Sequence, residues 1–158
     1  MALTKLDQLY RAVILEHSQT PRRRGTLDES TTQIELRNPT CGDVIQVQLN
    51  IQDGVVKDVR FDGSGCTISL ASASMMTDAI IGKPIEEALN LSKEFSQVVQ
   101  GNETKDQNAL GDAMMLSGVS KFPARIKCAT LSWKALEKAL GNQGTGVDGQ
   151  MRHEEITE

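Results

Sequence analysis

The sequence is poor in aromatic residues, which make up only 3% of its 158 residues. Base-stacking platforms and aromatic cages each need several such side chains, so we expect neither. An excess of basic residues is also missing, because 17 Lys and Arg are outnumbered by 21 Asp and Glu and the net charge is −4. Proteins that bind nucleic acid neutralise its phosphates with basic patches. The composition therefore predicts no nucleic-acid partner.

Long apolar runs are absent as well, and the longest one near the start of the chain is only Ala12 to Leu15. A membrane-spanning helix needs about 20 apolar residues, so we expect no membrane partner. Residues 1–17 mix charged with apolar positions and offer no small-residue cleavage site. This pattern is typical of a helix and not of an export signal, and it predicts a cytoplasmic protein.

Cysteine is scarce too, and the three that occur are Cys41, Cys66 and Cys128. An odd number of cysteines without an export signal makes a poor disulfide framework, because cytosolic thiols stay reduced. The cysteines indicate metal binding or sulfur chemistry instead.

The length of the chain fits one domain, at roughly 150 residues per domain. We assign that domain to residues 1–140. Residues 141–158 contain four glycines and almost no apolar side chains. Such a segment cannot offset its ordering entropy by burial, so we expect a flexible carboxyl-terminal tail.

Alternating apolar and polar residues predict strands in the first half of the chain. Residues 32–37 and 45–51 both follow a period of two, as half-buried strands do. After Asp53-Gly54, a pair typical of a hairpin turn, the chain returns through residues 55–61. Three such strands form an antiparallel meander that helices must cover on its apolar face, which is an α+β fold.

Elsewhere the apolar residues recur every three or four positions, which predicts helices. We expect them at residues 3–17, 68–80, 84–91, 92–100 and 123–140. The last of these is a long carboxyl-terminal helix, and residues 101–108 are expected to form a surface loop.

The three cysteines lie where an anionic sulfur is favoured. Cys41 is in the tight connection between the first two strands, Cys66 follows a glycine-rich turn at a helix start, and Cys128 lies in the first turns of the last helix. Unpaired N–H groups at a helix start favour a thiolate. Arg125 and Lys127 add positive charge beside Cys128.

If these places meet at one end of the domain, three thiolates and the Asp43 carboxylate give four ligands. Such a set fits a tetrahedral zinc ion. The cysteines are too widely separated to match the short cysteine pairs of zinc fingers, and isolated cysteines are often small buried hydrophobic residues. From the residues alone, a metal site and a structural role both stay open.

Three motifs occur in order along the chain: NPTCGD at residues 38–43, GSGCTISLASASMM at residues 63–76 and CATLSW at residues 128–133. Together they resemble the motifs of the U-type iron-sulfur cluster assembly proteins, the IscU/SufU family, over about residues 3–140. The resemblance implies an α+β fold with a three-stranded sheet. It also implies a metal site formed by Cys41, Asp43, Cys66 and Cys128.

Two departures from the IscU pattern favour the SufU branch. IscU scaffolds have a histidine before the third cysteine and a Leu-Pro-Pro-Val-Lys segment for a chaperone, where this chain has Lys127 and the sequence SKFPA at residues 120–124. The stretch from Leu91 to Gln107 also resembles an extra segment of SufU. This resemblance implies zinc, a SufS-like PLP-dependent cysteine desulfurase as the sulfur donor, and delivery to a downstream iron-sulfur assembly complex.

We predict that Cys41 is the catalytic thiol of a sulfurtransferase-like acceptor, because its loop can move whereas Cys66 and Cys128 are anchored on helices. Arg125 would orient the partner or steady a sulfur anion. The alternative is a scaffold or carrier that holds iron or a transient [2Fe-2S] cluster on the same ligands, since thiolates suit both groups. We interpret residues 22–24, a run of three arginines, as a solvated loop, with desulfurase docking as the alternative.

Overall fold

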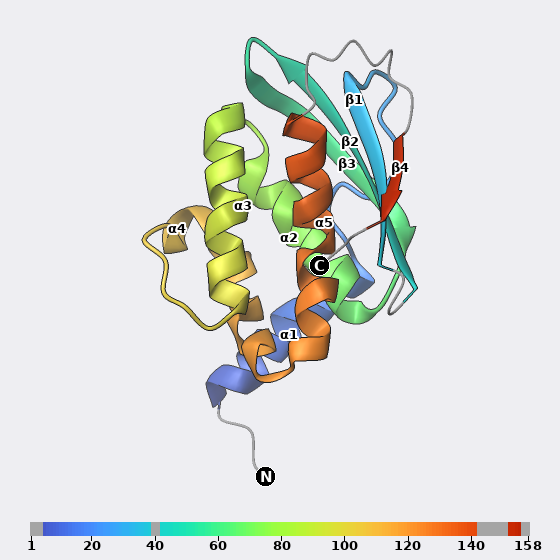
Figure 1. The fold of residues 1–158 in the computed structure, drawn as a ribbon. Helices are drawn as coiled ribbons and strands as arrows, with labels where there is room; N and C mark the ends of the chain where they lie inside the picture. Colours follow the sequence, from blue (N-terminus) through green and yellow to red (C-terminus); the bar gives the residue numbers. More distant parts are fainter. Residues whose placement is uncertain (1–4, 39–41, 142–151, 156–158) are drawn as a thin grey trace.

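The structure, a computed structural model, describes residues 5–38, 42–141 and 152–155, with side chains within residues 8–38 and 42–140. A sheet forms one layer, and the helices cover one of its faces (Figure 1). The elements follow in the order α1 (Lys5–Gln19), β1 (Thr32–Asn38), β2 (Asp43–Gln52), β3 (Val55–Ser64), α2 (Thr67–Ile80), α3 (Ile85–Val99), α4 (Gln107–Leu110), the 3-10 helix η1 (Gly111–Lys121), α5 (Pro123–Gly141) and β4 (Arg152–Glu155).

Strands β1, β2 and β3 form the antiparallel meander predicted from their alternation, with β2 between its two neighbours. In β2, Ile45, Val47 and Leu49 are fully buried while the residues between them are partly exposed. Asp53 and Gly54 have positive φ values of 54° and 74°, as a two-residue hairpin turn of type I′ requires. The α+β fold with a three-stranded meander is therefore confirmed.

The sheet has one further strand that the sequence pattern did not indicate. β4 lies parallel to β1, with Ile34 beside Arg152 and Arg37 beside Glu155. This segment falls within residues 141–158, where we expected a flexible tail. It contains no apolar residue, so the alternation that revealed the other strands could not reveal it.

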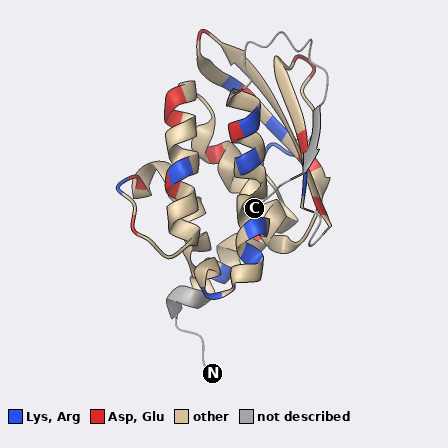
Figure 2. Ribbon diagram, viewed as in Figure 1, with Lys and Arg blue, Asp and Glu red and all other residues tan. Residues whose placement is uncertain are grey.

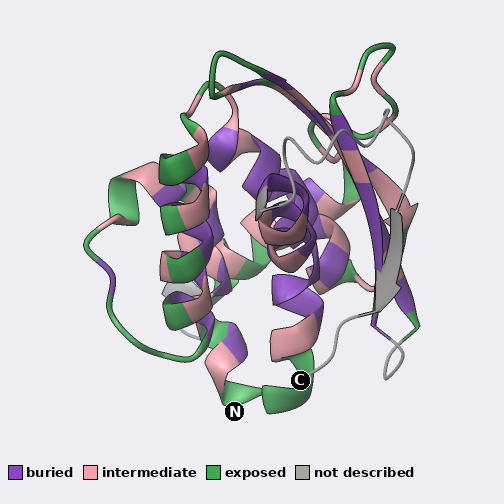
Figure 3. Ribbon diagram, turned by 45° about the horizontal axis from the view of Figure 1, so that its top comes forward, coloured by how far each residue is buried: buried purple, intermediate pink, exposed green. Residues whose placement is uncertain are grey.

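Helix α5 forms the centre of the helical layer, where it packs on β1 and β2 and contacts α2 and α3. Figure 3 shows much of α5 buried beyond its exposed first residues, and shows α3 buried on one side and exposed on the other. Trp133 of α5 stacks on Phe95 of α3 with a centroid distance of 4.5 Å. Its indole N–H donates to Ser72 Oγ at 3.1 Å, and the Ser72 hydroxyl donates to the carbonyl of Ala129. These contacts join α2, α3 and α5 into one core.

Residues 85–99 form one helix, so the prediction of two separate helices here is wrong. Ser92, at the expected break, is buried and donates to the carbonyl oxygen of Trp133 at 3.4 Å. It thereby keeps its place in a buried stripe with Ala88, Leu91 and Phe95. A polar residue whose hydroxyl is satisfied by another helix does not interrupt a helix.

Helix α1 is fixed to α2 and η1 through a buried histidine. His17 Nδ1 lies 2.8 Å from Ser74 Oγ, and Nε2 lies 2.9 Å from Asp112 Oδ2. His17 is only 3% exposed, and its contact with Ser74 is buried whereas its contact with Asp112 is partly buried. Together the two contacts hold α1 in place. Among the residues described, no helix combines the length and apolar character that a membrane span requires.

Candidate metal centre

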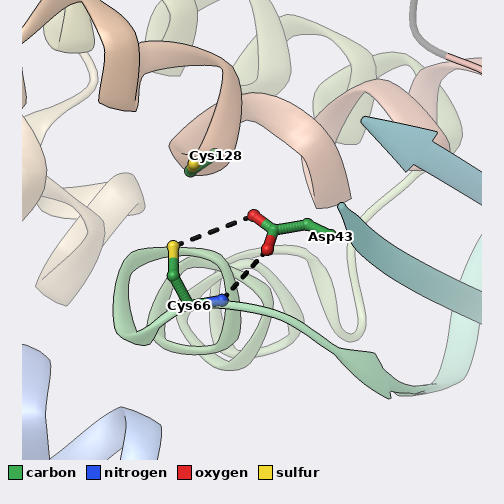
Figure 4. A group of neighbouring side chains, drawn as sticks. All are labelled: Asp43, Cys66 and Cys128. Atoms are coloured by element: carbon green, nitrogen blue, oxygen red, sulfur yellow. Dashed lines mark hydrogen bonds between the residues drawn. The ribbon is translucent and has the colours of Figure 1, made fainter. Parts of the chain in front are cut away.

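Three side chains from distant parts of the chain meet at one end of the sheet. Asp43 is the first residue of β2, Cys66 is the amino-terminal cap of α2, and Cys128 lies near the start of α5. One ligand atom from each lies within 4.8 Å of the others, and Figure 4 shows the side chains around one small space. The convergence expected for these three residues is present.

The end of β3 brings Cys66 to Asp43. Ser64 pairs with Val44 in the sheet, so the chain leaves β3 beside the start of β2. The turn then passes very close to Asp43, because a Cβ atom on Gly65 would lie 2.9 Å from Asp43 Oδ1. Glycine at this position therefore makes room for the carboxylate.

Hydrogen bonds fix the orientation of the Asp43 carboxylate. Its Oδ1 accepts the backbone N–H of Cys66 at 3.1 Å, and its Oδ2 accepts the hydroxyl of Ser69. Ser69 Oγ also lies 3.5 Å from Cys66 Sγ. Sequence reasoning did not single out Ser69 as a site residue, although its position three residues after Cys66 on a helix places both on one face.

The site is mostly shielded from solvent. Asp43 is 3% exposed and Cys128 is 1% exposed, whereas Cys66 is partly exposed. A buried carboxylate is unfavourable unless it is hydrogen-bonded, ion-paired or bound to a metal. Neither Cys66 nor Cys128 is in a disulfide, so both sulfurs have the covalent state that a metal ligand requires.

The donor set fits a tetrahedral zinc ion. Zinc-ligand bonds of 2.0 to 2.3 Å separate neighbouring ligands by about 3.3 to 3.8 Å. Cys66 Sγ and Asp43 Oδ2 lie 3.8 Å apart, and all three ligand atoms lie within 4.8 Å. Two sulfurs and one oxygen thus need only small side-chain rotations to bind one ion.

The other predicted site residues are Cys41, Arg125 and Lys127, and they differ in their distance in sequence or space from the three ligands. Cys41 lies outside the described residues, two positions before Asp43. Arg125 is exposed and lines a cavity of about 480 Å³ together with Cys66. Lys127 is partly buried and directly precedes Cys128. Of these three, Arg125 is therefore the one that shares a described cavity with a cysteine of the site.

Residues 9–141 match the family described as NifU-like N terminal domain. The chain belongs to this family. The NifU-like match covers all of the described site, and the predicted membership of the IscU/SufU group is confirmed. The chain is therefore an iron-sulfur cluster assembly protein with an Asp-Cys-Cys candidate metal site.

Similar proteins carry two different functional names. The chain is 55% identical over 141 residues to the zinc-dependent sulfurtransferase SufU of Bacillus subtilis, an alignment that covers 89% of this chain and 95% of that protein. It is 53% identical over 140 residues to the iron-sulfur cluster assembly scaffold protein IscU of Streptococcus pyogenes, with 89% and 87% covered. These identities are too close to separate the two roles.

A solved structure from Fervidobacterium islandicum, described as an iron-sulfur cluster assembly scaffold protein for the SUF system, superimposes with a TM-score of 0.76. It is 34% identical, and the match covers 81% of this chain and 93% of the other. The NifU-like fold is thus found in an independently solved relative.

Proposed function

We propose that this protein accepts sulfur from a PLP-dependent cysteine desulfurase and passes it to iron-sulfur cluster assembly, with Cys41 as the acceptor. We propose further that Cys41, Asp43, Cys66 and Cys128 hold zinc. The observation that carries the proposal is the approach of the last three residues to within 4.8 Å in a largely buried site.

The ligands differ in how firmly the chain holds them. Cys66 and Cys128 belong to helices that pack on one another, and Asp43 is fixed by two hydrogen bonds. Cys41 is joined to Asp43 through Gly42, which has a positive φ of 78°. When bound, zinc keeps cysteine ligands deprotonated and lowers their reactivity, so a sulfur acceptor must be able to leave it. Cys41, in a connection between strands, is the best suited to do so.

The proposed transfer is a thiol exchange that conserves electrons. The Cys41 thiolate attacks the terminal sulfur of the desulfurase persulfide, and a new S–S bond forms on Cys41. The S–S bond within the desulfurase breaks, and its cysteine leaves as a thiolate. Any proton on the terminal sulfur travels with that sulfur. Asp43, Cys66 and Cys128 keep their positions throughout the step.

Sequence features support sulfur transfer over a scaffold role. Lys127 stands where IscU scaffolds have a histidine, and the sequence SKFPA at residues 120–124 replaces the chaperone segment. The similar protein from Bacillus subtilis is named a zinc-dependent sulfurtransferase. The donor set does not decide between the roles, because thiolates bind both zinc and iron-sulfur clusters.

The test compares two alanine variants in a desulfurase assay. We expect Cys41→Ala to abolish stimulation of the desulfurase while most zinc stays bound, because Asp43 and the two cysteines anchored on helices remain. Cys128→Ala removes one of these two anchored sulfurs and should lose both zinc and stimulation. Mass spectrometry of the wild-type protein should find one extra sulfur atom on the peptide that contains Cys41. Unchanged stimulation by Cys41→Ala would eliminate the assignment.

Anaerobic reconstitution tests the scaffold alternative. If the protein forms a stable [2Fe-2S] cluster at physiological iron concentrations and transfers it to an apo-acceptor, the scaffold role replaces the proposed one. Zinc near one per chain in protein purified without added metal is the result that supports sulfur transfer.

A further inference from the structure

An apolar groove of about 510 Å³ lies beside the candidate metal centre, between α1, η1 and the starts of α2 and α5. Ile14, Ile68 and Val119 are among its apolar lining residues. Phe122 and Leu15, which also line it, are 62% and 38% exposed. Exposed large apolar side chains that gather in one place are a mark of an interaction site.

The groove is continuous with the metal centre. The smaller cavity beside Cys66 shares four lining residues with the groove, namely Thr67, Ile68, Phe122 and Arg125. A molecule that fills the groove therefore lies next to the thiol of Cys66. The occupant of such a groove is expected to be a protein that reacts at the centre.

The charged residues of the groove are basic and have no ion pair within the described part of the chain. Arg11, Lys121 and Arg125 line it and are exposed. Figure 2 shows basic segments of α1, η1 and the start of α5 near one another. The remaining arginines with described side chains all pair with carboxylates: Arg22 and Arg23 with Asp78, Arg24 with Asp62, Arg37 with Glu35 and Arg60 with Asp58.

This contrast matters because the whole chain is acidic, with a net charge of −4. Carboxylates are abundant, yet those of the described residues do not neutralise Arg11, Lys121 or Arg125. Complementary charge across an interface speeds association and selects the partner. The groove is thus suited to an acidic surface with an apolar side chain at its centre.

The groove is also held in shape before any partner binds. α1 forms one wall, and the contacts of His17 with Ser74 and Asp112 fix it to α2 and η1. A preformed site avoids part of the ordering cost of association.

We propose that this groove binds an acidic segment of the cysteine desulfurase that inserts an aromatic or aliphatic side chain between α1 and Phe122. The proposal rests on the proposed function, since it names the surface that recognises the sulfur donor. A second copy of this chain fits less well, because a symmetric contact through the groove would bring its three basic side chains against the same three on the partner.

Two variants test the proposal, with binding of the organism's own desulfurase measured by calorimetry. Arg11→Glu should weaken the affinity about tenfold at low salt, and Phe122→Ser should weaken it by a similar factor through the lost apolar anchor. Both residues are exposed, so the fold and zinc content should be retained. Lys57→Glu is the matched control, because Lys57 is exposed on β3 and outside the groove. It makes the same charge change and should alter affinity less than twofold.

Different results would contradict sulfur transfer by Cys41 and desulfurase binding in the groove. If Cys41→Ala binds the desulfurase normally but accepts no sulfur, the groove is supported independently of transfer. If Arg11→Glu binds as tightly as the wild type, or if Lys57→Glu weakens binding equally, the groove assignment is overturned. Self-association of the two variants is measured by analytical ultracentrifugation. If Arg11→Glu or Phe122→Ser changes self-association but not desulfurase affinity, the assignment is overturned in favour of a second copy of this chain.

Discussion

The two ends of the three-stranded meander are held together by different forces. Near the Asp53-Gly54 turn, the buried side chains are apolar, as at Ile51, Val56 and Val59. At the opposite end, polar and sulfur-carrying side chains are buried among the apolar ones, and they include Asn38, Asp43, Ser69 and Cys128. Apolar burial stabilises the turn end without help. The metal end needs hydrogen bonds and, we infer, a bound ion to satisfy its buried groups.

The strongest test of this contrast is a core substitution near the turn. Leu49→Ala removes a fully buried side chain from β2 and should lower the free energy of unfolding by about 2 to 5 kcal/mol. Zinc per folded chain should not change, because Leu49 pairs with Val59 far along the strand from Asp43. Urea unfolding and metal analysis measure both quantities.

An exposed residue of the same strand, Gln52, provides the control for Leu49→Ala. Gln52→Ala on the same strand should change stability by less than about 0.5 kcal/mol. Loss of zinc from folded Leu49→Ala protein would show that the two ends are coupled and would break the comparison.

Removal of zinc should have the next largest effect. At free zinc one hundred times above its dissociation constant, a chelator should lower the free energy of unfolding by about 2.7 kcal/mol. Hydrogen exchange should then accelerate around Asp43, Cys66 and Cys128 and change little at the Asp53-Gly54 turn. A uniform acceleration along all three strands would contradict the contrast. Cys128→Ser, which lacks a ligand, should not respond to the chelator.

Ser69→Ala is expected to have the smallest effect on stability. Loss of the hydroxyl that donates to Asp43 should lower the free energy of unfolding by about 1 to 2 kcal/mol. It should weaken zinc binding about 10- to 100-fold, as removal of such supporting hydrogen bonds typically does. A competition titration with a zinc indicator measures this affinity.

Ser132→Ala is the matched control for Ser69→Ala. Ser132 is 1% exposed, and its hydroxyl has no hydrogen-bond partner among the described groups. Its removal should leave zinc affinity unchanged. Equal weakening by the two variants would mean that Ser69 acts through general packing and not through Asp43.

The sequence predicted the fold where periodicity is local. The period of two in β2 and the Asp53-Gly54 pair identified the hairpin, because each depends only on neighbouring residues. β4 and the continuity of α3 were not predictable in this way. β4 forms by pairing with the edge of β1, which is far away in the sequence, and the hydroxyl of the buried Ser92 in α3 is satisfied by a carbonyl of α5.

The candidate site could be predicted only in part. Asp43, Cys66 and Cys128 are far apart in the sequence, so their meeting followed from a family resemblance and not from spacing. Ser69 was not predicted as a site residue, because its role depends on a hydrogen bond to another element. The groove was not predicted either, because Arg11 and Phe122 lie in segments that only the tertiary fold brings together.

The hydrogen bonds around Ser72 have a practical consequence. Trp133 is the only tryptophan in the sequence, and Ser72 links its indole to the carbonyl of Ala129, the residue after Cys128. Indole emission responds to the electrostatics of its hydrogen-bonded surroundings. The protein therefore carries its own optical reporter, and loading or emptying of the neighbouring ligands should be visible in real time without an attached dye.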